Sequence, residues 1–104
     1  MMELWEILVP TLMGDTQKPI KTKHHRNWDQ FVRKLSGGLT ILHPAKGQWL
    51  RPESNELVEE RMIPVRIACT EKDIQKIIKF TLQHYRQEVV MAYQISAKVL
   101  MVEK

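Results

Sequence analysis

The spacing of apolar residues along the 104-residue chain changes between the period of a β-strand and that of an α-helix. Residues 4–9 alternate between two faces, which predicts a first strand that ends at Pro10. An apolar stripe with helical spacing then predicts a first helix from about residue 24 to residue 36, with Gly37 supplying a left-handed cap. The stripe consists of Trp28, Phe31, Val32 and Leu35.

The middle of the chain is extended and is interrupted by turn residues. Residues 39–43 are predicted to form the second strand. A turn over residues 45–47 leads into a third strand that begins at residues 48–50. Residues 52–55 are rich in turn formers and predict a second turn or excursion. Residues 57–69 then continue extended, with apolar residues at alternate positions.

A second helix and a last strand complete the pattern. Thr70 is a good N-cap, and Asp73 stands three residues later, in a capping-box-like position. The apolar stripe that follows is made of Ile74, Ile77, Ile78, Thr81, Leu82 and Tyr85. The last strand extends from about residue 88 towards residue 102, which is longer than a usual strand. We therefore expect a bulge or bend near Ser96, or a projecting tail.

The predicted order of elements is β-α-β-β-α-β, which is the ferredoxin-like plan. We expect a single α+β domain over residues 1–104, with a four-stranded antiparallel sheet and both helices on one face. The first and third strands should lie at the centre of the sheet. The face without helices must then be polar, hold a ligand or pair with a second copy of the chain.

The composition is that of a globular protein, with 43% hydrophobic and 27% charged residues. No apolar run approaches the roughly 18 residues of a membrane span. The first residues include acids and no basic segment, so we expect no signal peptide. The single cysteine, Cys69, excludes an internal disulfide and is compatible with a reducing compartment. We therefore expect a cytoplasmic location.

The net charge of +4 comes largely from a basic segment between the first strand and the first helix. The candidate anion-binding residues in and beside it are Lys18, Lys21, Lys23, His24, His25 and Arg26. Such a segment meets phosphate or an acidic partner, or it is simply a solvated connector. The connector over residues 11–22 is long, and long links are often functional or mobile.

Strand alternation turns Ile7 and Val65 towards the helices and places Glu6 and Arg66 on the opposite, open face of two neighbouring strands. The other residues expected on the open face are Leu4, Leu8, Thr40, Leu42, Glu60, Met62, Val90, Ala92 and Gln94. This mixture suits a homodimer interface that encloses a small polar pocket. The alternative is a surface salt bridge beside incidental apolar residues, which would contribute little.

The candidate ligand-binding residues are Glu6, Trp49, Glu60, Arg66 and Gln94. Trp49 follows a glycine turn and is expected at a rim, where it would stack on a ligand, anchor a partner or simply pack.

Two other constellations suggest chemistry. His25 and Asp29 have helical i, i+4 spacing, but a zinc site needs three or four ligands. We therefore expect no metal and no cofactor, and we expect His25 to donate to Asp29. Cys69 and His84 would be a nucleophile and a base, or Cys69 would be buried and inert.

The chain also resembles a family of small bacterial proteins of unknown function, over about residues 26–95. The likeness is carried by Trp28-x-x-Phe31, Gly38-Leu39-Thr40, Gly47-Gln48-Trp49 and Glu60-Arg61. Met62 stands where a serine is expected in that family. The resemblance implies a ferredoxin-like α+β fold and no established activity.

Three functions follow from these patterns. The leading hypothesis is a homodimeric domain that binds a small ligand on the open face. The second is an enzyme of the dimeric α+β-barrel type, with Glu6 or Glu60 as acid or base and Arg66 holding an anion. The third is a nucleic-acid binder that uses residues 18–26. We rank it last because no aromatic pair is predicted on the open face. Whether the protein is an enzyme stays open at this point.

Overall fold

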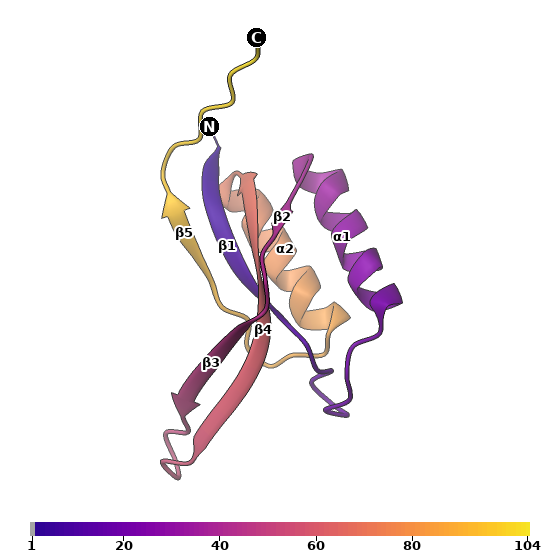
Figure 1. The fold of residues 1–104 in the computed structure, drawn as a ribbon, viewed down its shortest axis with the longest axis vertical. Coiled ribbons are helices and arrows are strands. Elements are labelled where there is room, and N and C mark those ends of the chain that lie inside the picture. Colours follow the sequence, from indigo (N-terminus) through magenta and orange to yellow (C-terminus); the bar gives the residue numbers. More distant parts are fainter. Residues whose placement is uncertain (1) are drawn as a thin grey trace.

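The computed structural model describes residues 2–104, and within them it contains two helices and five strands (Figure 1). The elements are β1 (Glu3–Pro10), α1 (Thr22–Ser36), β2 (Thr40–Ile41), β3 (Ala45–Leu50), β4 (Leu57–Cys69), α2 (Glu71–His84) and β5 (Ala92–Ser96). All strand pairs are antiparallel, in the order β2-β4-β1-β5, and β3 also pairs with β4.

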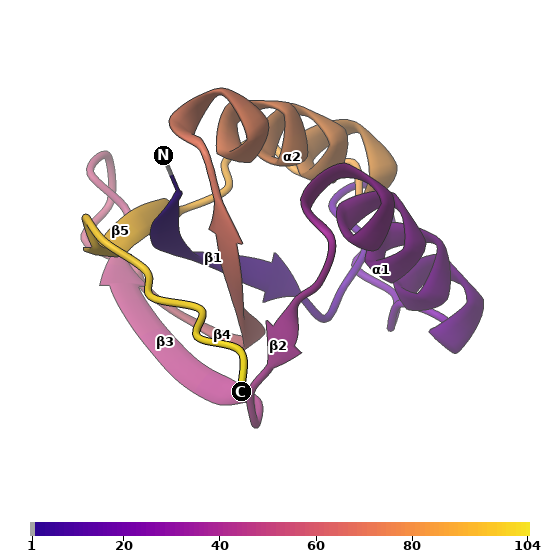
Figure 2. The ribbon, with the colours of Figure 1, turned by 90° about the horizontal axis from the view of Figure 1, so that it is seen from above.

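Both helices lie on the same side of the sheet, as the view from above shows (Figure 2). β1 and β4 occupy the centre of the sheet, as predicted for the first and third strands. The fold is therefore α+β and ferredoxin-like, and this prediction is confirmed. The predicted number of four strands is wrong, because residues 45–50 form a strand of their own in the described part of the chain.

The additional strand, β3, forms a hairpin with the first half of β4, in a register that runs from Ala45 opposite Met62 to Leu50 opposite Leu57. The predicted turn over residues 45–47 is thus wrong. Gly47 marks a close approach instead, because a Cβ atom on it would lie 2.5 Å from the Cε atom of Met62. The turn lies at residues 51–56, where Asn55 has a φ of 57°.

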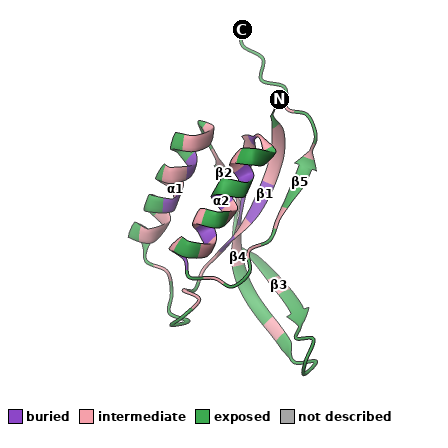
Figure 3. Cartoon of the chain, turned by 180° about the vertical axis from the view of Figure 1, so that it is seen from behind, coloured by how far each residue is buried: buried purple, intermediate pink, exposed green. Residues whose placement is uncertain are grey.

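This hairpin extends away from the rest of the molecule as an arm. β1 pairs only with the second half of β4, up to Pro10 opposite Met62. The arm, residues 45–61, therefore lacks helix cover and is largely exposed (Figure 3). It contributes to a longest dimension of 52 Å, against 28 and 24 Å in the other directions.

The core lies between the helices and the sheet (Figure 3). Its buried apolar side chains are Ile7, Val9, Trp28, Val32, Val65, Ile67, Cys69, Ile74, Ile77 and Tyr85. The indole of Trp28 donates to Oγ1 of Thr81 at 2.8 Å, and that hydroxyl donates to the carbonyl of Ile77. The one hydroxyl thus satisfies a buried donor and links the two helices.

Both predicted helix ends are confirmed. The chain leaves α1 through Gly37 in the left-handed conformation, with a φ of 93°. The hydroxyl of Thr70 accepts a hydrogen bond from the backbone of Asp73 at 3.2 Å, which caps α2. Neither helix in residues 2–104 has the length and apolar character of a membrane span.

The last strand, β5, is shorter than the stretch from residue 88 to residue 102. Its register with β1 shifts, since Trp5 lies opposite Gln94 whereas Leu4 lies opposite Ser96. Ile95 is therefore the extra residue of a β-bulge. Residues 97–104 continue beyond the strand as a projecting tail (Figure 1). The predicted bulge near Ser96 and the tail are both confirmed.

Candidate functional site on the open sheet face

The centre of the open face holds the predicted charge pair. Glu6 and Arg66 lie directly opposite each other on β1 and β4. Nε of Arg66 donates to Oε1 of Glu6 at 2.9 Å. The predicted cross-strand neighbourhood of these two side chains is confirmed.

Tyr93 is a third member of this site, and sequence analysis missed it. It lies opposite Glu6 on β5, and its hydroxyl donates to Oε2 of the same carboxylate. Glu6 is thereby bound through one oxygen to each of its two neighbouring strands. We call Glu6, Arg66 and Tyr93 the charged triad.

The placement of Ala92 and Gln94 on the open face is wrong. Ala92 lies opposite Ile7 and Gln94 opposite Trp5, so both share the face that the helices cover. A shift of one residue in strand register exchanges the two faces of a strand, and this shift moved Tyr93 out of the predicted site. Val90 is also misplaced, because it packs against the core.

The charged triad has a defined protonation state. The hydrogen bond from Tyr93, together with the bond and charge of Arg66, lowers the pKa of Glu6 despite its burial. The same bond to Glu6 raises the pKa of Tyr93. At neutral pH the site therefore holds a carboxylate, a guanidinium and a neutral phenol.

The carboxylate of the triad is buried, whereas its other two members are partly exposed. Glu6 is 7% exposed, whereas the side chain of Arg66 is 43% exposed. Within residues 2–104 the guanidinium of Arg66 is hydrogen-bonded through Nε, so its two terminal nitrogens remain available for a ligand. A guanidinium in this state can hold a carboxylate or phosphate through paired hydrogen bonds.

Apolar side chains surround the triad. Met91 and Tyr93 are exposed by 61% and 38%, and the backbone N–H of Leu8 donates to the carbonyl of Met91 at 3.0 Å. Other apolar residues of the open face include Leu4, Leu8, Leu42 and Met62, which are half-buried. The charged centre of the open face therefore lies among apolar side chains.

Trp49 and Glu60 lie on the arm, away from the triad. Trp49 is 44% exposed and stands beside Arg51, whose guanidinium carbon is 5.8 Å from the centre of the indole ring. Glu60 lies opposite Gly47 and lines a shallow hollow on the arm. Six residues of strand separate Glu60 from Arg66, which is about 20 Å. The structure therefore does not bring these predicted site residues together.

The histidines near the start of α1 face α2. Nδ1 of His25 lies 2.8 Å from the hydroxyl of Tyr85, so the expected bond from His25 to Asp29 is wrong. Nε2 of His84 donates to the carbonyl of His24 at 2.7 Å. Residues 2–104 contain no group of three His, Cys, Asp or Glu side chains with the geometry of a metal site.

Cys69 and His84 do not form a nucleophile and base. Burial raises the pKa of the Cys69 thiol to about 11, so the thiol is protonated at neutral pH. Cys69 lies just before the N-cap of α2, and His84 is the last residue of that helix. A 14-residue helix is about 20 Å long, which keeps the two side chains apart.

Comparison with solved structures identifies related folds. The divalent cation tolerance protein CutA1 from Thermus thermophilus superposes with a TM-score of 0.69 and 14% identity, over 96% of this chain and 88% of that one. The periplasmic divalent cation tolerance protein CutA from Archaeoglobus fulgidus gives a TM-score of 0.68 and 9% identity, over 97% and 88%.

A phage SAM lyase, solved in complex with S-methyl-5'-thioadenosine, gives a TM-score of 0.64 and 19% identity, over 92% of this chain and 90% of that one. At these identities the likenesses show the ferredoxin-like fold alone. No protein-family model and no curated protein matches the chain. The resemblance to a small bacterial family therefore stays a prediction.

Proposed function

We propose that this chain is the single-domain protomer of a homodimer, and that the charged triad binds a small organic anion on the open sheet face. The observation that carries the proposal is a buried carboxylate, Glu6, bridged to both neighbouring strands on a face that no helix covers. A partly apolar sheet face without a covering element is usually covered by a partner or a ligand.

The dimer is supported by the contrast between the triad and its surroundings. The open face presents Leu4, Leu8, Met91 and Tyr93 around the charges. Apolar residues contiguous with a half-exposed ion pair favour a second copy of the same face as the cover. In a two-fold arrangement each face would meet its own equivalent, which satisfies both protomers at once.

The ligand class follows from the free donors of the triad. The carboxylate of Glu6 neutralises the charge of Arg66 but occupies Nε only. The terminal nitrogens form a fork that matches a carboxylate, and Leu8 and Met91 offer apolar surface beside it. A carboxylic acid with a small apolar body fits these features.

Two measurements test the proposal. Sedimentation equilibrium at roughly ten micromolar protein is expected to give the mass of two chains, since a standard-sized interface holds at that concentration.

Titration calorimetry with benzoate, a carboxylate attached to an apolar ring, is expected to show binding that Arg66→Met abolishes. Arg33→Met, an exposed arginine on α1, is the matched control and should bind benzoate normally. A monomer would contradict the dimer, and equal binding by both variants would contradict the site.

A second candidate function is an enzyme that uses Glu6. Its lowered pKa keeps Glu6 anionic, which suits a base or a counter-charge for a cationic substrate, and the phenol of Tyr93 adjoins it. The similarity to the phage SAM lyase suggests a sulfonium compound as the first substrate to test. Incubation with S-adenosylmethionine, followed by mass spectrometry, should then show turnover that Glu6→Gln removes. No turnover by the unmodified protein would leave the binding function as the better proposal.

A further inference from the structure

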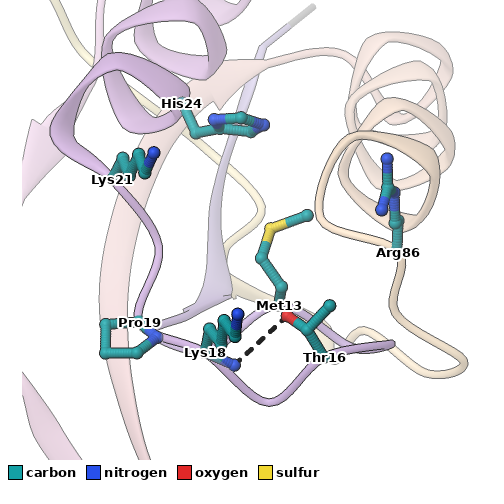
Figure 4. Close-up of a pocket in the computed structure, with 7 residues that line it drawn as sticks. All are labelled: Met13, Thr16, Lys18, Pro19, Lys21, His24 and Arg86. Carbon is teal, nitrogen blue, oxygen red and sulfur yellow. Dashed lines mark hydrogen bonds between the residues drawn. The ribbon is translucent and has the colours of Figure 1, made fainter.

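A second cavity, of about 350 Å³, lies at the start of α1, on a different part of the molecule from the open sheet face. The residues that line it come from the β1–α1 connector, the first turn of α1 and the segment after α2 (Figure 4). They are Met13, Thr16, Lys18, Pro19, Lys21, His24 and Arg86. Its volume falls in the range of sites for small molecules.

The connector that forms one wall is folded by its own hydrogen bonds. The backbone N–H of Lys18 donates to Oγ1 of Thr16 at 3.3 Å (Figure 4). The backbone of Met13 donates to the carbonyl of Lys18 at 2.9 Å, and that of Ile20 donates to the carbonyl of Thr11 at 3.0 Å. Leu12 and Pro19 form an antiparallel bridge between these two bonds. The long connector is therefore a small hairpin, which fixes the backbone at Lys18.

The connector is also fastened to the segment after α2. Gly14 donates to the carbonyl of Tyr85 at 3.0 Å, and the side chain of Gln87 donates to the carbonyl of Leu12. A Cβ atom on Gly14 would lie 1.7 Å from the carbonyl oxygen of Arg86, so only glycine allows this approach. The two walls of the cavity are thus preformed.

The cavity is cationic. Lys18, Lys21 and Arg86 contribute three positive charges, and Asp15 contributes one negative charge through a 2.5 Å bond to Nη1 of Arg86. The ion pair orients Arg86, and a net positive charge remains. The first turn of α1 carries no acidic residue and has no side-chain cap, so its backbone N–H groups add to the attraction for an anion.

The centre of the cavity is apolar. The side chain of Met13 points between His24 and Arg86, and the ring of Pro19 lies beside Lys18 (Figure 4). A flexible thioether adapts to flat or irregular apolar groups. The preferred occupant therefore has an anionic end and an apolar body.

We infer that this cavity binds a small phosphorylated molecule, with the phosphate held by Lys18, Lys21 and Arg86 and the apolar body resting on Met13. The size and the mixed lining correspond to a nucleoside monophosphate. This site is separate from the charged triad, so a negative binding result at one site leaves the proposal for the other unaffected.

Titration calorimetry with adenosine monophosphate tests the inference. One molecule is expected to bind per chain, and adenosine without the phosphate should bind at least about tenfold more weakly. The double variant Lys18→Gln with Lys21→Gln, in which both side chains are exposed, should lose about tenfold or more in affinity. Lys72→Gln is the matched control, since this exposed lysine lies in the first turn of α2, at the end opposite Arg86.

Four outcomes would overturn the inference. One is the absence of binding, and another is equal binding of adenosine and its monophosphate. The third is a loss in Lys72→Gln as large as in the double variant, which would indicate diffuse charge attraction. Single-stranded DNA binding more tightly than the monophosphate, with a steep salt dependence, would replace the site with a nucleic-acid surface. Amide shifts in the unmodified protein give a second readout, and they should cluster at residues 13–21 and 86.

Discussion

The main polar contacts on the two faces of the sheet differ in kind. On the helix-covered face the buried polar contacts are neutral, as between Trp28 and Thr81. On the open face the central contact is ionic, between Arg66 and Glu6. One hydrogen bond can offset the cost of burying a neutral polar group. An ion pair loses more hydration energy on burial, so it needs several hydrogen-bond partners or access to water. The first arrangement suits a sealed core, and the second is the one on which the proposed ligand binding depends.

The largest effect is expected from Trp28 on the helix-covered face, measured against Trp49 on the exposed arm. Trp28→Ala should lower the free energy of unfolding by about 4–5 kcal/mol, because a buried indole leaves a cavity and Thr81 loses its donor. Trp49→Ala, on the exposed arm, should cost less than about 1 kcal/mol. Chemical denaturation of the two variants measures the difference. Similar losses would mean that the arm is packed against something in solution.

Arg66→Ala is expected to have the next largest effect. If a second copy covers the open face, the variant leaves Glu6 desolvated and unpaired, at a cost of about 3 kcal/mol or more. The double variant Glu6→Gln with Arg66→Met should recover part of the loss. Denaturant melts, run at protein concentrations that keep the dimer, decide this. A loss under about 1 kcal/mol would show that the pair is exposed to water and that no partner covers it.

Tyr93→Phe tests the bond that the sequence pattern did not reveal. The loss should be about 1 kcal/mol, since a hydrogen bond to a charged group is strong but Tyr93 is partly exposed. Because the pKa of Glu6 is lowered in the folded state, its stabilising contribution is present above pH ~4.3 and is lost as the pH falls.

The stability of Tyr93→Phe should therefore fall less between neutral pH and pH ~3 than that of the unmodified protein. Tyr85→Phe, on the helix-covered face, is the control and should leave this acidic part of the profile unchanged. An identical acid profile for the unmodified protein and Tyr93→Phe would argue against the bond to Glu6.

The smallest effect concerns His25, which is half-buried between the helices. Burial lowers its pKa in the folded protein, Asp29 opposes this shift, and the charges of His84 and His24 add to it. Below pH ~6.5 the unfolded chain takes up the proton first, so stability falls as the pH decreases through this range. His25→Gln should flatten the profile between pH ~7 and pH ~5 by up to about 1 kcal/mol.

His43→Gln, at an exposed position between β2 and β3, is the matched control for this effect. It should leave the profile unchanged. If both variants behave alike, the acid sensitivity arises elsewhere than in the contact of His25 with Tyr85.

Features that depend on neighbours within one turn or one strand were predictable. Gly37 and Thr70 mark their helix ends because the required conformation or hydrogen bond involves residues at most four positions away. Alternation likewise sufficed to place Glu6 and Arg66 on the same face, since a strand has a period of two. The element order then indicated which strands were neighbours.

Local pattern alone did not reveal the partner of Glu6 on β5. Residues 90–95 are mostly apolar on both faces, so a shift by one position left the pattern nearly unchanged. Only the pairing of Tyr93 with Glu6, 87 positions apart, set the register. The turn predicted at Gly47 was wrong for a related reason. A glycine in a strand that leaves room for the side chain of Met62 on the facing strand cannot be told from a turn glycine in the sequence.

Short-range preferences in the chain therefore specify the helices, the caps and the faces of the central strands, because those preferences act whether or not the rest of the molecule is folded. The triad, the arm and the cationic cavity depend on long-range closure. Arg86 joins Lys18 and Lys21 because Gly14 allows the connector to touch the segment after α2. The conformational preferences of the connector residues do not separate this closed arrangement from an open loop. The cavity therefore forms only when the packed tertiary structure brings these distant residues together.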